Sequence, residues 1–425
     1  MNPGHSLPSN LDEWLHYIEA LHSKDIELGL QRVQQVAQRL NLRANFPIIT
    51  VAGTNGKGSS CAMLAQIYQH AGYKVASYTS PHLIDYRERI CINQQMISEP
   101  QACTAFAAVE QARAGTPLTY FEFGTLAAMY YFLQQQVDVA ILEIGMGGRL
   151  DAVNLFEPDC SIVTSIDLDH MEYLGNTREA IGREKAGIYR SGKPAICADR
   201  NAPQSLIDYA QQIDSEFYLI GQHFDFQASQ HHWQFDSQSI SLPALPMPGL
   251  TGAFQLNNAS AVMMALHLMQ GRLPISWQTV AQALPQIRLA GRYQTIHDQP
   301  RVIVDVAHNP HAAQALLENL RAQPCAGKTI AVMAMLGDKD IAAVARLMQP
   351  VIDVWYLAAL EHSRGASLQQ TQQAVQASIQ QQPIICQQNL TLAFHEAYKQ
   401  AGENDRIIVF GSFFTVATIM RILLD

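Results

Sequence analysis

Residues 48–60 combine an apolar run, three glycines, a lysine and a pair of serines. The apolar residues Ile48–Val51 predict a buried strand, and the helix that follows is predicted over residues 61–70. Glycines between them let the backbone turn tightly, so that successive N–H groups can point at one anion. Lys57 adds positive charge for outer phosphates, and the serine hydroxyls could reach a bound Mg²⁺. The stretch therefore predicts a site for a nucleoside triphosphate.

The alternative interpretation of this stretch is an ordinary glycine-rich turn between a strand and a helix. Gly58 stands where the standard phosphate-binding loop has Ser or Thr after the lysine. A chance turn rarely supplies Thr, Lys and Ser together with three glycines, which favours the nucleotide site.

Polar side chains also follow other predicted strands. Glu143 ends the apolar run 137–144, where a carboxylate could hold Mg²⁺ beside the phosphate loop, unless it only caps the turn. Ser80 and His170, each at a strand end, could complete a second metal site. Mg²⁺ prefers oxygen ligands, so a hydrogen-bonded structural role is the alternative for His170.

The second half of the chain carries its own polar strand end. Asp305 and His308 stand at the end of the predicted strand 301–306, and Arg292 lies in the predicted domain junction 284–293. An arginine delivered from one domain onto a nucleotide held by another makes catalysis depend on domain closure. The alternative for Arg292 is a salt bridge between domains.

The elements that must position these residues alternate between strands and helices, which predicts an α/β fold with a mainly parallel sheet. Such sheets bind ligands at the carboxyl ends of their strands. Helices are also predicted over residues 26–40 and 124–135, and a small antiparallel excursion over residues 217–245. We predict two domains, residues 1–290 and a smaller α/β domain over residues 291–425.

Composition narrows the class of protein. The chain has 425 residues, 48% of them hydrophobic and 15% charged, as expected for a globular enzyme of two domains. Its net charge of −9 argues against broad nucleic-acid binding, and its seven cysteines form no Cys-x-x-Cys pair. Residues 1–6 lack a signal pattern, and the apolar run 118–133 is interrupted by Glu122. We expect a cytoplasmic monomer that does not enter membranes.

Taken together, these patterns resemble the bacterial dihydrofolate synthase/folylpolyglutamate synthase family, which is related to the Mur ligases. The resemblance runs along nearly the whole chain and is carried by nine segments: 22–30, 53–59, 80–83, 120–123, 143–154, 165–170, 182–187, 291–294 and 305–312. It implies a P-loop domain with a mainly parallel sheet, followed by a smaller Rossmann-like α/β domain, as in Mur ligases.

The resemblance also implies roles for individual residues. The implied ATP contacts are Thr54, Asn55, Gly56, Lys57, Gly58, Ser59, Asn258 (or its neighbour Asn257), Arg292 and Asp305. The implied metal ligands are Ser80, Glu143 and His170. The implied pterin-binding residues are Asp25, Ile26, Glu27, Leu28, Thr119, Tyr120, Phe121, Glu122, Leu150, Asp151 and Ala152. The implied catalytic residues are Lys57, Lys185, Arg292 and His308.

Lys185 matches a lysine that relatives carry as a carbamate. Only a neutral amine attacks CO₂, so the modification requires that Lys185 be desolvated.

The implied reaction joins L-glutamate to 7,8-dihydropteroate, and further glutamates to tetrahydrofolates, through an acyl phosphate made with ATP and two Mg²⁺ ions. Two other ligases remain possible from the sequence: a folylpolyglutamate synthase without the dihydropteroate step, and a Mur-type ligase acting on a UDP-muramyl acid. A nucleotide switch that hydrolyses ATP to regulate a partner is the alternative from another class.

Overall fold

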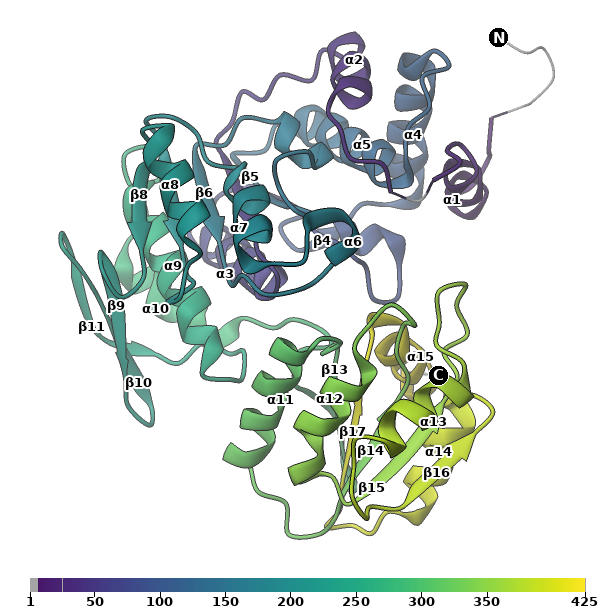
Figure 1. Cartoon of the computed structure of the whole chain (residues 1–425). Coiled ribbons are helices and arrows are strands. Elements are labelled where there is room, and N and C mark those ends of the chain that lie inside the picture. The colour runs from purple at the N-terminus through teal and green to yellow at the C-terminus, as the bar shows by residue number, and fades with distance from the viewer. Residues whose placement is uncertain (1–6, 25, 425) are drawn as a thin grey trace. The chain divides into compact units, whose positions relative to one another are not determined.

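The structure is a computed structural model that describes residues 7–24 and 26–424. The chain divides into two compact units (Figure 1). The first comprises Met1–Gly249 and Leu256–Ile287, and the second comprises Leu250–Gln255 and Arg288–Asp425.

An eight-stranded sheet forms the centre of the first unit. Its strand order is β4-β3-β2-β5-β1-β6-β7-β8, parallel from β2 to β8, with β3 and β4 antiparallel at one edge. The strands are β1 (Ile48–Ala52), β2 (Val75–Tyr78), β3 (Ile90–Ile92), β4 (Gln95–Met96), β5 (Val139–Glu143), β6 (Cys160–Val163), β7 (Pro194–Cys197) and β8 (Glu216–Leu219). Strands β1 and β5 are buried at every position, as expected for parallel strands covered on both faces.

Ten α-helices accompany this sheet in the described part of the first unit. They are α1 (Leu11–Glu19), α2 (Gln31–Arg39), α3 (Lys57–His70), α4 (Glu99–Arg113), α5 (Tyr120–Gln135), α6 (Met171–Leu174), α7 (Arg178–Ala186), α8 (Gln204–Gln212), α9 (Phe254–Leu268) and α10 (Trp277–Ala283). Short 3₁₀ turns are η1 (Tyr86–Arg89), η2 (Ala152–Leu155) and η3 (Leu284–Gln286). Trp14 of α1 packs against Phe106 of α4 and Phe123 of α5, which joins these helices in one apolar core.

The predicted antiparallel excursion is a three-stranded sheet of order β11-β10-β9. Its strands are β9 (Phe224–Ala228), β10 (His232–Ser237) and β11 (Ser241–Pro246). The prediction began this excursion too early, at Phe217. Strand β8 instead pairs in parallel with β7 and extends the main sheet.

The second unit has a six-stranded sheet of order β12-β13-β17-β14-β15-β16, with β12 antiparallel and the others parallel. The strands are β12 (Gln294–Asp298), β13 (Arg301–Asp305), β14 (Thr329–Met333), β15 (Val354–Ala358), β16 (Ile384–Gln387) and β17 (Arg406–Phe410). The helical elements are α11 (Pro310–Ala322), α12 (Ile341–Met348), η4 (Gln349–Val351), α13 (Leu368–Gln376), α14 (Leu390–Gln400) and α15 (Phe413–Leu424). Helix α12 packs beside α11 and α13, while α14 packs beside α15 (Figure 1).

Three helices begin elsewhere than periodicity predicted. Helix α3 begins at Lys57 rather than residue 61, because Gly56 takes a left-handed φ of 91° and ends the turn there. Helix α5 begins at Tyr120 rather than residue 124, because a capping box at Thr119 fixes its start. Helix α2 begins at Gln31 rather than residue 26, because the N–H of Gly29 donates to the Leu150 carbonyl (3.2 Å) instead of to a carbonyl one helical turn earlier.

None of the helices in the described residues has both the length and the apolar character needed to cross a bilayer.

Candidate active site

The predicted phosphate loop follows β1 at the carboxyl edge of the first unit's sheet. Gly53 has a φ of +151°, and a Cβ there would lie 1.8 Å from the hydroxyl of Thr164. A Cβ on Gly56 would lie 2.5 Å from the side-chain oxygen of Asn258. Both positions therefore require glycine. The second contact places Asn258, one of the predicted ATP contacts, directly against the loop.

Helix α3 starts within this loop and places Lys57 at its first position. The first N–H groups of a helix lack partners inside it and attract anions, because the positive end of the helix dipole lies there. Ser59 and Ser60 are buried on the same turn. The loop therefore has the local structure of a phosphate site.

Lys57 and Lys185 converge on one carbonyl oxygen. The Lys57 ammonium donates to the carbonyls of Gly53 (3.1 Å) and Thr54 (3.2 Å). The Lys185 amine, from helix α7, donates to the same Gly53 carbonyl at 2.8 Å and is only 4% exposed. Burial, and next the charge of Lys57, lower the pKa of Lys185 to about 7. Burial therefore favours the neutral amine that carbamylation requires.

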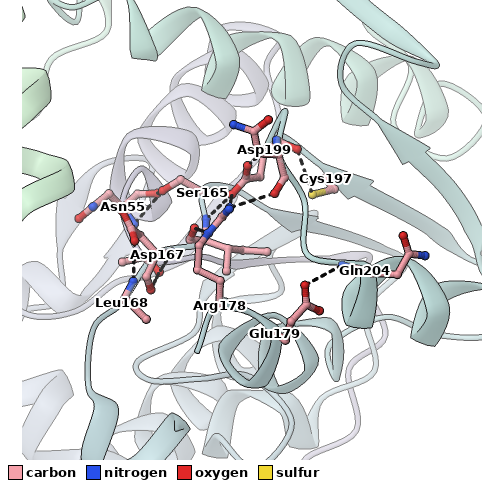
Figure 2. A network of polar contacts seen from close by, with 12 residues as sticks. Asn55, Ser165, Asp167, Leu168, Arg178, Glu179, Cys197, Asp199 and Gln204 are labelled. Carbon is pink, nitrogen blue, oxygen red and sulfur yellow. Dashed lines mark hydrogen bonds and ion pairs between the residues drawn. The ribbon is translucent and has the colours of Figure 1, made fainter. Parts of the chain in front are cut away.

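The segment after β6 holds the phosphate loop in place (Figure 2). The Thr54 N–H donates to the Ser165 carbonyl (2.6 Å), and the Asn55 N–H donates to the Ser165 hydroxyl (3.2 Å). The Thr54 hydroxyl donates to the Asp167 carbonyl at 3.1 Å and accepts the Asp167 N–H at 3.0 Å. These bonds fix the loop through backbone groups of residues 165 and 167 and through the Ser165 hydroxyl.

A second layer of contacts fixes the segment after β6 in turn. Arg178, at the start of α7, donates to the Ile166 carbonyl (2.9 Å) and forms an ion pair with Asp199 (3.0 Å). The same Asp199 oxygen accepts the N–H of Ile166 at 2.8 Å. Figure 2 shows Arg178 and Asp199 on the side of this segment that faces away from Asn55. We call Arg178 and Asp199 the loop brace.

Two of the three predicted metal ligands lie in contact. Glu143, at the end of β5, is 4% exposed and accepts the N–H of Ser80 at 3.1 Å. His170 is the N-cap residue of helix α6 and has a left-handed φ of 50°, and its ring nitrogen lies 4.0 Å from Asp169. In the portion of the chain that the structure describes, no group of three or more His, Cys, Asp or Glu side chains is arranged to hold a metal ion.

The predicted pterin segments come from three distant parts of the sequence, and the structure brings them together. Arg32 of α2 donates to the Glu27 carbonyl (2.9 Å) and to the carboxylate of Glu122 (3.0 Å), which is 3% exposed. The bond from Gly29 to Leu150 adds the third segment. We call residues 26–28, 119–122 and 150–152 the acceptor segments. Asp25, also predicted here, lies outside the described residues.

Sequence reasoning missed Arg32, which ties two acceptor segments together. Its ion pair with Glu27, at 3.3 Å, lies across the start of α2, where a continuous helix was predicted. The signal was an arginine that follows shortly after the implied binding residues 25–28, but its partner Glu122 is 90 positions away. The periodicity of apolar residues cannot predict an ion pair between residues so far apart in the sequence.

Other predicted acceptor residues have structural partners. The Phe121 ring lies against Gly145, where a Cβ would come within 2.6 Å of it. Asp151 caps the turn η2 and accepts the N–H groups of Met146 (2.9 Å) and Val153 (3.0 Å). Burial raises the pKa of Asp151 to about 7, although these hydrogen bonds oppose the shift.

Within the second unit, Asp305 ends β13 and accepts the N–H groups of Tyr293 and Ala307, each at 2.8 Å. Burial raises the pKa of its carboxyl, and the positive charge of Arg292 opposes that shift. The Arg292 guanidinium lies 5.0 Å from the ring centre of Phe413, and the His308 ring lies 6.3 Å from the same ring. Arg292, Asp305 and His308 therefore form one cluster at the carboxyl ends of β13 and β17.

Comparisons with known proteins agree with this organisation. Residues 51–266 match the Mur ligase middle domain, and residues 291–413 match the glutamate ligase domain of Mur ligases. The chain is 42% identical to the dihydrofolate synthase/folylpolyglutamate synthase of Escherichia coli K12, over 98% of this chain and 96% of that protein.

Solved structures give the same result. The Escherichia coli FolC protein in complex with DHPP and ADP superposes with a TM-score of 0.93 at 42% identity, over 99% of both chains. The bifunctional Yersinia pestis enzyme complexed with AMPPNP and a Mn ion gives 0.92 at 43% identity, over 99% of this chain and 100% of that one. The Mur ligase-like fold and the family predicted from the motifs are both confirmed. The chain therefore belongs to the dihydrofolate synthase/folylpolyglutamate synthase family of ATP-dependent ligases.

Proposed function

We propose that this chain joins L-glutamate to 7,8-dihydropteroate and adds further glutamates to tetrahydrofolates, with ATP as co-substrate. The observation that carries the proposal is the 42% identity to the Escherichia coli bifunctional enzyme along 98% of the chain. The pair of lysines that share the Gly53 carbonyl at the phosphate loop, and the assembled acceptor segments, support it independently.

The chemistry explains why ATP is needed. A carboxylate is a poor acylating agent, because its leaving group would be oxide. Attack of the acceptor carboxylate on the γ-phosphorus breaks the bond to the β-phosphate oxygen, releases ADP and leaves an acyl phosphate. The glutamate amine then attacks the acyl carbon, gives up a proton and displaces inorganic phosphate, which forms the amide.

Side chains of the phosphate loop act on the first step. Lys57 neutralises charge on the γ-phosphoryl group as it moves, and the N-terminus of α3 binds the phosphates. Thr54, Asn55, Gly56, Gly58, Ser59, Asn258, Arg292 and Asp305 keep their predicted role as ATP contacts. His308, with Asp305, is the proposed carrier of the amine proton.

Magnesium fits the donor set at this site, because Glu143 offers a buried carboxylate and Ser80 a hydroxyl. We propose that two Mg²⁺ ions bind with ATP and that Ser80, Glu143 and His170 hold them. Bound Mg²⁺ would supply positive charge to the phosphate oxygens. A carbamate on Lys185 would add an oxygen ligand.

Carbamylation also fits the charges around Lys185. It converts a cation that repels Lys57 into an anion that attracts it, on a carbonyl that the two amines share. The lowered pKa of Lys185 supplies the neutral amine from which the carbamate forms.

The test is an acceptor comparison with the purified chain. We expect ATP-dependent release of phosphate, and a product heavier by one glutamyl residue, with dihydropteroate and with tetrahydrofolate. Product from tetrahydrofolate alone would identify a monofunctional folylpolyglutamate synthase, and product from a UDP-muramyl acid a Mur-type ligase. ATP hydrolysis without any dependence on glutamate would identify a nucleotide switch.

We assign ATP and acceptor binding to residues 1–290 and the glutamate-ligase role to residues 291–425. We further propose that the enzyme acts as a monomer in the cytoplasm, where ATP is available and its seven free cysteines stay reduced. Sedimentation at micromolar concentration tests the oligomeric state.

A further inference from the structure

Arg89, at the end of the turn η1, is held by aromatic rings instead of by a carboxylate. Its guanidinium carbon lies 5.5 Å from the ring centre of Tyr86 and 5.6 Å from that of Tyr120. Its Nε donates to the ring of His82 at 2.9 Å. Among the residues that the structure describes, Arg89 has no carboxylate partner.

The neighbouring arginine shows what an ordinary arginine does on this turn. Arg87 forms a close ion pair with Asp85 (2.6 Å), two residues away on the same turn. Arg89 is half-buried, and its planar guanidinium group is held in place by the Tyr86 and Tyr120 rings and by the hydrogen bond to His82. An arginine fixed in this way is prepared to bind a carboxylate from outside the chain.

The contacts of Arg89 place it beside both parts of the proposed active site. Through Tyr120 it touches an acceptor segment. Through His82 it is bonded to the loop of Ser80, whose N–H donates to Glu143, a proposed metal ligand. The part of an acceptor that joins its pterin to its reacting carboxylate has to pass between these two regions.

The two proposed acceptors differ in that part. Dihydropteroate has one carboxylate, on its benzoyl ring, and that carboxylate reacts. Tetrahydrofolate ends in a glutamyl group, whose γ-carboxylate reacts and whose α-carboxylate does not. The second reaction therefore brings an additional anion that the first lacks.

We infer that Arg89 binds the α-carboxylate of the folate's terminal glutamyl group, and so determines specificity for polyglutamylation. The inference rests on the proposed function and deepens it. It also explains why Arg89 has no carboxylate partner within residues 7–24 and 26–424, since a paired guanidinium would first have to give up that carboxylate.

The experiment compares kcat/KM for the two acceptors in the wild-type chain and in Arg89→Gln, with Arg87→Gln as the matched control. Because Arg89→Gln removes a charge-assisted hydrogen bond, we expect kcat/KM for tetrahydrofolate, divided by kcat/KM for dihydropteroate, to fall about tenfold to a hundredfold. We expect the ratio of the two kcat/KM values to stay within about twofold of wild type in Arg87→Gln, since a partly exposed ion pair contributes little.

A modified acceptor tests the same contact without relying on a variant. Tetrahydrofolate with its α-carboxylate converted to an amide should lose a similar factor with the wild-type chain and almost nothing more with Arg89→Gln. That pattern would establish a direct contact between the two groups.

Three outcomes would overturn the inference. An unchanged ratio of kcat/KM values would show that Arg89 does not distinguish the two acceptors. An equal loss of kcat/KM for both acceptors would show that Arg89 binds the reacting carboxylate or stabilises the fold. Additive losses in the amide experiment would exclude a direct contact. A wild-type chain that makes no product from either acceptor would overturn the proposed function itself, and with it this inference.

Discussion

The phosphate loop and the acceptor segments lie in the same unit, but they are built by different contacts. The loop is a single stretch, residues 53–59, fixed by backbone and hydroxyl hydrogen bonds to the segment after β6. The acceptor segments come from three places in the chain and are joined mainly by one arginine.

This difference has a physical cause and a consequence. Phosphate is the same ligand in every nucleotide, so a loop of backbone N–H groups at a helix start is sufficient to bind it. An acceptor with a pterin ring and a variable tail needs side chains gathered from several elements. We therefore expect changes in the loop to reduce the rate of chemistry, and changes at the acceptor segments to reduce affinity for the acceptor.

The largest effect is predicted for Lys57→Ala. Removing the cation from the phosphate loop should lower kcat about a thousandfold, as for other cations that act on a moving phosphoryl group. The measurement is phosphate release with saturating acceptor and glutamate. ADP binding, followed by calorimetry, should be reduced much less. Turnover near that of wild type would show that the loop is not the catalytic phosphate site.

The second prediction concerns Lys185. We expect Lys185→Ala to lower activity about a hundredfold, as loss of a metal-site component often does. Lys185→Arg should be equally impaired, because a guanidinium keeps the charge but forms no carbamate. Lys193→Ala, at an exposed lysine paired with Asp159, is the control and should keep its activity.

The pH dependence of Lys185 follows from its pKa of about 7. The buried amine is mostly protonated at pH 6 and mostly neutral at pH 8, whereas an ordinary lysine stays protonated up to about pH 10. With labelled CO₂ held constant, a carbamate carbon signal should grow between pH 6 and 8 and be missing in Lys185→Arg. A wild-type chain without this signal at any pH would contradict the modification.

The contrast between the two regions also sets how much of the site could be predicted. The loop's strand, its glycines and Lys57 are consecutive, so the sequence alone indicated a phosphate site and its place in a parallel sheet. Lys185 required more, since the lowered pKa depends on burial against Gly53, which is 132 positions away.

The acceptor segments show where prediction from periodicity failed. A continuous helix from residue 26 was wrong, because Gly29 bonds to Leu150, and Arg32 bonds to both Glu27 and Glu122. No local pattern encodes these bonds. The resemblance to a known family supplied these segments, but not Arg32, which holds them together. Long-range ion pairs of this kind become visible only in the folded chain.

Arg32→Gln tests whether the acceptor segments act on affinity. The variant leaves the buried Glu122 carboxylate without its ion pair, so we expect KM for both acceptors to rise about tenfold. KM for ATP should change little, because the phosphate loop does not contact Arg32. Arg39→Gln, on the same helix but bonded to residues 112, 113 and 116, is the matched control. A rise in KM for ATP equal to that for the acceptors would contradict the division between the two regions.

The smallest effect is predicted at the loop brace, where Arg178→Gln changes a residue that touches neither substrate. The Arg178 side chain is 39% exposed, so its ion pair with Asp199 should contribute little to stability. It fixes the Ile166 backbone, however, and the residues on either side of Ile166 bind the phosphate loop. We therefore expect KM for ATP to rise about threefold, the factor that an ion pair of this exposure supports. KM for both acceptors should be unchanged, as should all constants in Arg200→Gln, which breaks the exposed pair with Asp225. A rise in KM for the acceptors instead of for ATP would mean that the segment after β6 does not position the phosphate loop. It would also mean that the contacts of Arg178 stabilise the acceptor segments.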